Sequence, residues 1–152
     1  MRTIHRDIVG GYIISADGNV LLGKSRKGGV FNGVYIVPGG GIDQGETKEA
    51  ALRREMLEET GINTDDATVS ALRISSGESE KTLRDTDERV LVKMDFFDYI
   101  ISLKQNAEDV VVVADDDWEE PRWFSPGELA GIKTSAPTRS GLDDLYKQAI
   151  ND

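Results

Sequence analysis

The chain has 152 residues, which is enough for one well-buried domain and too few for two ordinary ones. Its formal net charge of −10 argues against non-specific binding to DNA, RNA or anionic membranes, because such binding needs a basic surface. The absence of cysteine excludes disulfides, a thiolate nucleophile and a cysteine-built zinc site. No apolar run approaches the roughly 18 residues of a membrane span, and the N-terminus lacks the apolar core of a signal peptide. We therefore expect a cytoplasmic protein with one domain over residues 1–152, and a homodimer is compatible with the sequence.

The first third of the chain predicts a hairpin followed by a glycine-rich turn. Ala16-Asp17-Gly18-Asn19 is a strong turn signal between two apolar runs. Gly39-Gly40-Gly41 allows backbone conformations that suit carbonyls or amides turned toward a ligand. The elements expected here are strands over 7–15, 20–26 and 34–37, with a loop over 27–33.

The rest of the chain predicts helices interleaved with further strands. Thr47 is a suitable N-cap and Gly61 a suitable C′ residue, so a helix is expected over 47–60. No element is predicted over the polar segment 77–89, and 115–120 is interpreted as an acidic loop. The remaining expected elements are strands over 69–75, 90–103, 110–114 and 122–124 and helices over 125–130 and 138–150. This order predicts an α/β protein with a mixed sheet and helices on its faces.

The helix expected over 47–60 carries the most informative charge pattern, formed by Arg54, Glu55, Glu58 and Glu59. At about 100° per residue, the three glutamates fall within an arc of roughly 100° on one side. Like charges at this spacing repel one another. A divalent cation would offset the repulsion, and Mg²⁺ is held by oxygen ligands and often shared with substrate phosphates.

The alternative is an amphipathic surface helix with a solvated charged face, the usual fate of charge runs. The apolar residues of the helix argue against this alternative. Ala50 and Leu57 lie on one side, and Leu52 and Met56 lie on another. We therefore expect the helix to be wedged between two packing surfaces with only the carboxylate arc open. Ala51 lies within that arc, where a small side chain would leave room for an ion or a phosphate.

The spacing of this region is that of the Nudix box, Gly-x5-Glu-x7-Arg-Glu-U-x-Glu-Glu-x-Gly-U, in which U is a bulky aliphatic residue. Every defined position is filled, by Gly40, Glu46, Arg54, Glu55, Met56, Glu58, Glu59, Gly61 and Ile62. The chain therefore resembles the Nudix hydrolases, loosely over residues 7–130. The resemblance implies a Nudix-type α/β/α sandwich, with a mixed β-sheet and a catalytic loop-helix-loop beside it. It also implies Mg²⁺-dependent or Mn²⁺-dependent hydrolysis of the diphosphate linkage in a nucleoside diphosphate derivative.

Residue roles follow from the resemblance by matching position. It implies that Glu58, Glu59 and the carbonyl of Gly39 ligate the metal. Glu55 would be a further ligand or the general base, two roles that vary within the family.

Other box residues would act indirectly, and a further ligand would come from outside the box. Arg54 would orient the glutamates, with Glu46 as its partner. Many relatives add a distal acidic ligand or base, for which Asp117 and Glu120 are the candidates here. A solvated acidic loop, or a calcium loop without the usual Asp/Gly periodicity, is the competing interpretation of 115–120.

Cations outside the box are candidates for phosphate binding. Lys24 and Arg26 end a predicted strand and could hold phosphates or be exposed charges. Arg84 lies with Lys81 and Arg89 in a polar segment that could be a substrate lid or a solvated loop.

The substrate class is inferred by elimination. No proline lies between Pro38 and Pro121, although relatives that resemble ADP-ribose pyrophosphatases carry one there. The tyrosine that marks diadenosine polyphosphate hydrolases is also missing. A (deoxy)nucleoside triphosphate cleaved to monophosphate and pyrophosphate is therefore the expected substrate, with ADP-ribose or an NDP-sugar as the alternative. A non-catalytic nucleotide-binding module, or a calcium- or partner-binding domain, would be the alternatives of another class.

Overall fold

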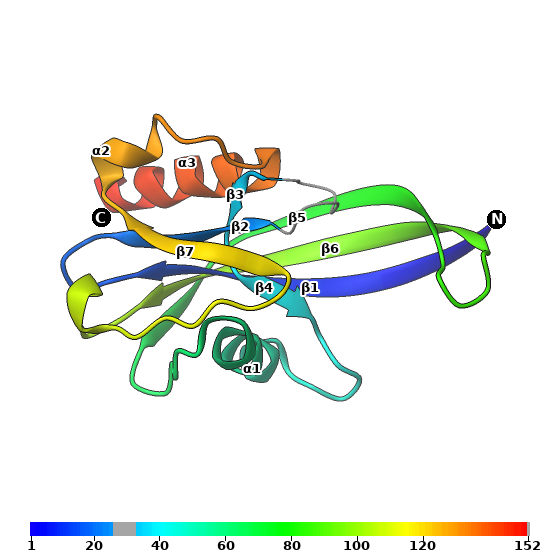
Figure 1. Cartoon of the computed structure of the whole chain (residues 1–152), viewed down its shortest axis with the longest axis horizontal. Coiled ribbons are helices and arrows are strands. Elements are labelled where there is room, and N and C mark those ends of the chain that lie inside the picture. The colour runs from blue at the N-terminus through cyan, green and yellow to red at the C-terminus, as the bar shows by residue number, and fades with distance from the viewer. Residues whose placement is uncertain (26–32, 152) are drawn as a thin grey trace.

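The computed structural model describes residues 1–25 and 33–151, and within them seven strands form one mixed sheet between two layers of helices (Figure 1). The strands are β1 (Arg2–Ile14), β2 (Val20–Ser25), β3 (Tyr35–Ile36), β4 (Gly39–Gly41), β5 (Thr68–Thr82), β6 (Arg89–Ser102) and β7 (Trp118–Phe124). Their order is β3-β2-β1-β6-β5, while β4 pairs with β1 and β7 pairs with β2. The expected α/β sandwich with a mixed sheet is confirmed.

The centre of the sheet is the parallel pair β1 and β6, which stay in register along all 13 residues of β1. β5 runs antiparallel to β6 on the other side. These three strands extend well beyond the helices toward the end where the N-terminus lies (Figure 1). The prediction of no element over 77–89 is wrong, because β5 continues to Thr82 and β6 begins at Arg89. Backbone pairing along the ladder supports this largely polar hairpin, in which Val90 and Val92 are buried.

One helix covers the first face of the sheet. α1 (Lys48–Thr60) begins where the Thr47 hydroxyl accepts a hydrogen bond from the amide of Ala50, 3.1 Å away. It ends at Gly61, whose φ of 75° is a left-handed conformation that glycine adopts without strain. The predicted caps of this helix are therefore confirmed.

The opposite face is covered by α2 (Pro126–Leu129) and α3 (Ala136–Asn151), and a short 3₁₀ helix spans Ala107–Asp109 (Figure 1). Ser125 and Glu128 form a capping box at the start of α2. No helix in the described ranges is long and apolar enough to cross a bilayer.

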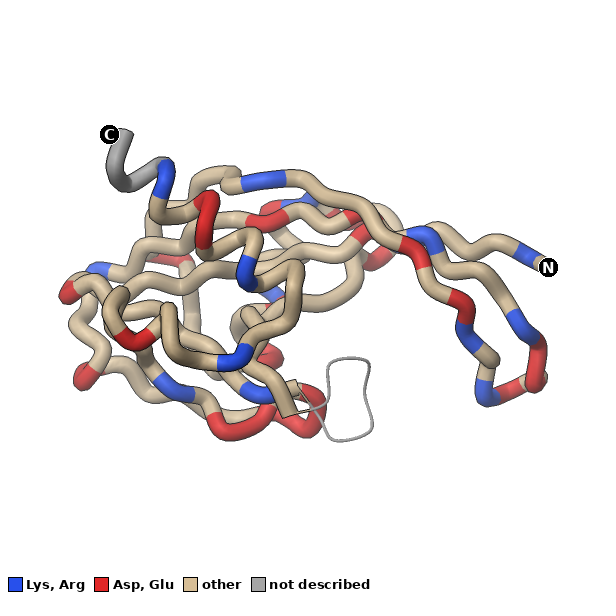
Figure 2. Tube along the Cα trace, turned by 90° about the horizontal axis from the view of Figure 1, so that it is seen from above, with Lys and Arg blue, Asp and Glu red and all other residues tan. Residues whose placement is uncertain are grey.

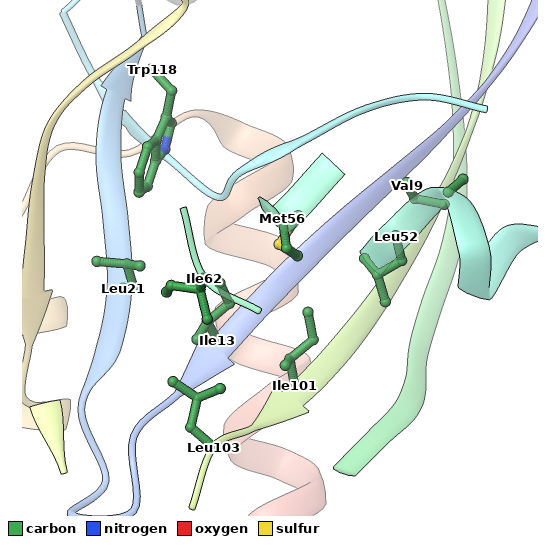
Figure 3. Close-up of a cluster of buried hydrophobic side chains, with 10 residues drawn as sticks. Val9, Ile13, Leu21, Leu52, Met56, Ile62, Ile101, Leu103 and Trp118 are labelled. Atoms are coloured by element: carbon green, nitrogen blue, oxygen red, sulfur yellow. The ribbon is translucent and has the colours of Figure 1, made fainter. Parts of the chain in front are cut away.

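A hydrophobic layer fills the space between each face and its helices. The layer beneath α1 is shown in Figure 3, and its labelled members are Val9, Ile13, Leu21, Leu52, Met56, Ile62, Ile101, Leu103 and Trp118. The layer beneath α3 consists of Tyr12, Val20, Leu22, Leu72, Phe124, Leu129, Leu142 and Leu145. Alternation along β1 places Val9 and Ile13 in one layer and Tyr12 in the other.

The structure corrects the expected packing of α1. Only one side of the helix is buried, through Leu52 and Met56, whereas Leu57 is 52% exposed and Ala50 is exposed. The helix is therefore not wedged between two surfaces. Ala51 is fully buried in the hydrophobic layer, so it does not leave open room for an ion.

Two expectations for the segment after the 3₁₀ helix are also wrong. Residues 110–114 form no strand; Val110 and Val112 pack on the core while Val111 and Val113 are exposed. The acidic loop predicted over 115–120 is shorter than expected, because β7 already begins at Trp118. That side chain is fully buried and donates from Nε1 to the carbonyl of Ile36 at 3.2 Å.

Candidate active site

The candidate site lies where α1 meets β4. β4 is a short glycine strand whose three residues pair with Ile8, Val9 and Gly10 of β1. The Glu55 carboxyl lies directly against Gly40, so closely that a Cβ at Gly40 would collide with it. The missing side chain at this box glycine therefore lets a helix carboxylate lie against the strand.

Arg54 and Glu46 form the best-ordered contact of the site. The Arg54 Nε and Nη2 atoms donate to the two Glu46 carboxylate oxygens at 2.7 and 2.9 Å, a bidentate pairing. Nη2 also donates to the Gly41 carbonyl at 3.0 Å, which ties the helix to β4. The hydrogen bonds from Arg54 lower the pKa of Glu46 to about 2, helped by a bond from the Asp43 amide. The structure thus brings Arg54 together with the partner expected from the sequence.

The same guanidinium reaches two more glutamates of α1. Its Nη1 atom donates to Glu55 at 2.9 Å and to Glu58 at 3.1 Å. The Glu55 side chain is mostly buried, whereas that of Glu58 is 59% exposed. Burial raises the pKa of Glu55, and the hydrogen bond from Arg54 opposes that rise. One arginine therefore fixes the orientation of three carboxylates.

Glu59 differs from the other glutamates because it is only 8% exposed and has no cationic partner among the described residues. Its Oε2 atom accepts a hydrogen bond from the amide of Gly39 at 3.2 Å. Burial raises its pKa to about 8, and the negative charges of Glu55, Asp115 and Asp117 add to the rise. A buried carboxylate among other carboxylates is costly unless a cation neutralises it.

These residues fit a divalent cation by the chemistry of their donors. The donors of the glutamates are carboxylate oxygens, and the resemblance adds the carbonyl of Gly39. Oxygen donors of this kind are those that Mg²⁺ and Mn²⁺ prefer. In the described part of the chain, no three His, Cys, Asp or Glu side chains are already arranged to share one ion. Arg54 engages Glu55 and Glu58 instead, and Glu59 is held by Gly39.

The two candidates for a distal ligand or base, Asp117 and Glu120, lie in different surroundings. Asp117, together with Asp115, lies close enough to Glu59 to raise its pKa. Asp115 was included in the acidic segment but not singled out from the sequence. Glu120 lies in β7 with a φ of 48°, and its exposed carboxylate pairs with Lys24 at 3.4 Å.

Two of the candidates for phosphate binding, Lys24 and Arg84, lie in different parts of the structure. Lys24 lies on β2 and forms that ion pair with Glu120. Arg26 lies outside the described residues. Arg84 lies in the turn between β5 and β6. This turn is at the protruding end of the sheet, away from α1 (Figure 1), where Figure 2 shows both acidic and basic residues. In the same hairpin, Arg89 pairs with Glu80 at 3.2 Å. The structure therefore does not bring Arg84 to the glutamates.

A hollow on the other side of β4 was not foreseen from the sequence. It has a volume of about 180 Å³ and is lined largely by apolar residues, including Ile8, Val37 and Phe96. Its only acidic lining residue in the described ranges is Asp98. Burial raises the pKa of Asp98 to about 6, and the positive charge of Arg73 opposes that rise. The available sequence signal was a single aspartate in an otherwise apolar stretch of the strand expected over 90–103.

Comparison with known proteins places this geometry in a family. The model of the NUDIX domain matches residues 4–147. This chain belongs to the Nudix family. It is a Nudix pyrophosphohydrolase, and Nudix hydrolases generally use divalent metal ions.

Individual relatives agree with the family assignment. The chain is 30% identical over 132 residues to the nucleoside triphosphatase NudI of Escherichia fergusonii, covering 86% of this chain and 89% of that protein. Two solved structures share the fold. The Nudix domain of Shewanella oneidensis NrtR complexed with ADP ribose has a TM-score of 0.71 and 15% identity, with 96% of this chain and 89% of that chain covered. The E. coli dihydroneopterin triphosphate pyrophosphohydrolase has a TM-score of 0.68 and 18% identity, with 90% and 92% covered.

Proposed function

We propose that this Nudix protein hydrolyses a (deoxy)nucleoside triphosphate to the monophosphate and pyrophosphate, with Mg²⁺ or Mn²⁺ as its metal. The observation that carries the proposal is the carboxylate cluster at α1, in which Arg54 links Glu46, Glu55 and Glu58 beside the buried Glu59. The relative at 30% identity, whose name is nucleoside triphosphatase, supports the triphosphate as substrate. We also take residues 1–152 to act as one catalytic domain, since the family model spans 4–147.

The metal would be held by Glu58, Glu59 and the carbonyl of Gly39, with Glu55 as a further ligand or the general base. A divalent cation bound there supplies positive charge to the phosphate oxygens and lowers the pKa of water. Asp117, which lies near Glu59, is the remaining candidate for a distal ligand or base. Glu120 is less suited to that role, because it pairs with Lys24 on the neighbouring strand.

The protein's own side chains would orient the metal ligands and would accept or release protons. Arg54 acts as a positioning residue, because its contacts with Glu46 and the Gly41 carbonyl fix the guanidinium that orients Glu55 and Glu58. Glu55 is the candidate general base. Its burial raises its pKa above that of an ordinary glutamate, which makes it a better proton acceptor. The raised pKa of Glu59 favours its protonated form at neutral pH, and a cation bound beside it would favour loss of that proton.

The proposal is tested with a nucleotide panel assayed for release of pyrophosphate and phosphate. The panel contains common ribo- and deoxyribonucleoside triphosphates, ADP-ribose, NDP-sugars and dinucleoside polyphosphates, each with Mg²⁺. We expect a triphosphate to have the highest kcat/KM and to give pyrophosphate. A tenfold preference for ADP-ribose or an NDP-sugar would overturn the substrate but leave the reaction class standing. Binding of nucleotides without turnover of any of them would support the non-catalytic alternative.

A further inference from the structure

The hollow beside β4 is joined to the carboxylate cluster by one residue. Gly39 lines the hollow, and its amide is the group that donates to Glu59 at 3.2 Å. A substrate whose phosphates lie at the cluster can therefore place its other end in the hollow. We propose that the hollow holds the nucleobase and that the Asp98 carboxylate selects bases that present an exocyclic amino group. This inference rests on the proposed function and names its substrate class more finely.

Asp98 is placed in the hollow by the register of the sheet. It lies on β6 opposite Gly10 of β1, and a Cβ at Gly10 would lie only 2.8 Å from its Oδ1 atom. The carboxyl therefore extends across β1 at the position where no side chain opposes it. Within the described ranges, the Asp98 side chain accepts no hydrogen bond and forms no salt bridge, although the positive charge of Arg73 acts on it. A half-buried carboxylate without a partner is unfavourable, and a donor from a ligand would satisfy it.

The walls of the hollow suit a flat ring. Ile8, Ile36, Val37, Pro38 and Phe96 supply apolar and aromatic surface on which a base can pack. The volume of about 180 Å³ is smaller than the roughly 300–1,000 Å³ of sites that hold a whole drug-sized ligand. It therefore fits one ring system rather than a complete nucleotide, and the phosphates must lie elsewhere.

Few other polar groups that line the hollow are available to distinguish one nucleobase from another. The Ser135 hydroxyl contacts the Thr138 hydroxyl at 2.9 Å and accepts from the Thr138 amide at 3.3 Å, so both are engaged at the start of α3. The other hydroxyl-bearing lining residues in the described ranges are Ser75 and Tyr12, and Tyr12 is only 1% exposed. Because a hydroxyl can donate or accept, Ser75 does not discriminate between amino and carbonyl groups, whereas an ionised carboxylate does.

The charge of Asp98 determines which nucleobases the hollow would prefer. An ionised carboxylate has acceptor sites only, so it bonds an amino group and repels a carbonyl oxygen. Arg73, its register partner on β5, favours the ionised form. Cytosine and uracil form the test pair, because cytosine presents an amino group at C4 where uracil presents a carbonyl, and N3 changes from an acceptor to an N–H donor. CTP is therefore expected to be preferred over UTP.

The test compares CTP with UTP, and dCTP with dUTP, for the wild type and for Asp98→Asn, at pH 8 with Mg²⁺. The wild type should prefer the cytosine nucleotide at least tenfold in kcat/KM, mainly through KM. A carboxamide at this position offers both a donor and an acceptor, so Asp98→Asn should bring the ratio to within about threefold of unity. A wild type without the preference, or an unchanged ratio in the variant, would overturn the inference.

A second variant tests independently whether the base binds in the hollow. Gly10→Ala places a methyl group near the Asp98 carboxyl and 3.5 Å from a Val37 methyl, and should raise KM for both bases with little change in kcat. Unchanged KM values in a folded Gly10→Ala protein would count against the hollow.

Binding of CMP and UMP, measured by calorimetry, separates the two proposals because it needs no turnover. Preferential binding of CMP that Asp98→Asn abolishes supports the base site even if no triphosphate is cleaved. Cleavage of triphosphates with equal binding of CMP and UMP overturns the base site and leaves the proposed function intact.

Discussion

Replacing Glu59 with glutamine should make the metal-free protein more stable at alkaline pH. Burial raises the pKa of Glu59 from 4.5 to about 8, and at 1.36 kcal/mol per unit the ionised side chain costs at most about 5 kcal/mol in the fold. Between these two pH values the folded state holds more protons than the unfolded state. The free energy of unfolding therefore falls as pH rises through that window. Glutamine keeps the shape and can still accept from the Gly39 amide, but it does not ionise.

The assay is urea unfolding in EDTA at pH 5 and pH 8. From the same pKa values, the wild type should lose about 3 kcal/mol more than Glu59→Gln between these two points. Asp98 also has a raised pKa, but it titrates in both proteins and cancels in the difference. The raised pKa of Glu55 cancels only in part, because the charges of Glu55 and Glu59 act on each other. Glu49→Gln is the matched control, because Glu49 is an exposed glutamate of the same helix. An identical loss of stability in the wild type and Glu59→Gln would refute the reasoning.

Three further outcomes follow from the site and the core. Arg54→Ala should lower both turnover and the free energy of unfolding, the latter by about 1 to 3 kcal/mol, because it leaves neighbouring carboxylates unpaired; unchanged kinetics and urea midpoint would contradict its positioning role. Met56→Ala removes a fully buried side chain and should cost about 2 to 5 kcal/mol in urea unfolding, whereas a cost below about 1 kcal/mol would contradict the described core. Excess EDTA should abolish turnover, and Mg²⁺ or Mn²⁺ should restore it; full activity in EDTA would exclude the metal.

The helix α1 could be predicted from the sequence because its signals are local. Thr47 and Gly61 cap it, and the spacing of its charged residues depends only on the helical period. The pairing of Arg54 with Glu46 is expected from the family resemblance, and the structure shows that it is bidentate. The burial of Glu59 and Ala51 could not be read from that period, since it depends on which side of α1 meets the sheet.

Features that depend on strand pairing between residues far apart in the sequence were missed or wrongly assigned. β5 continues to Thr82 although its second half is polar and exposed, because it pairs with β6 along its length. The valine run over 110–114 has high strand propensity but forms no ladder, and propensity alone does not supply a partner strand. Asp98 is noticeable as a charge in an apolar strand, yet its place opposite Gly10 requires the register of β1 and β6.

Product analysis of triphosphate hydrolysis by the wild type, Glu59→Gln and Glu49→Gln tests the central claim most directly. The claim is that the carboxylate cluster of α1 carries out metal-dependent cleavage between the α- and β-phosphates. With Mg²⁺, the wild type and Glu49→Gln should release nucleoside monophosphate and pyrophosphate at similar rates. Glu59→Gln should be slower by about 10³-fold or more, roughly 4 kcal/mol in transition-state stabilisation. Near-native pyrophosphate release by a folded Glu59→Gln protein would contradict the account.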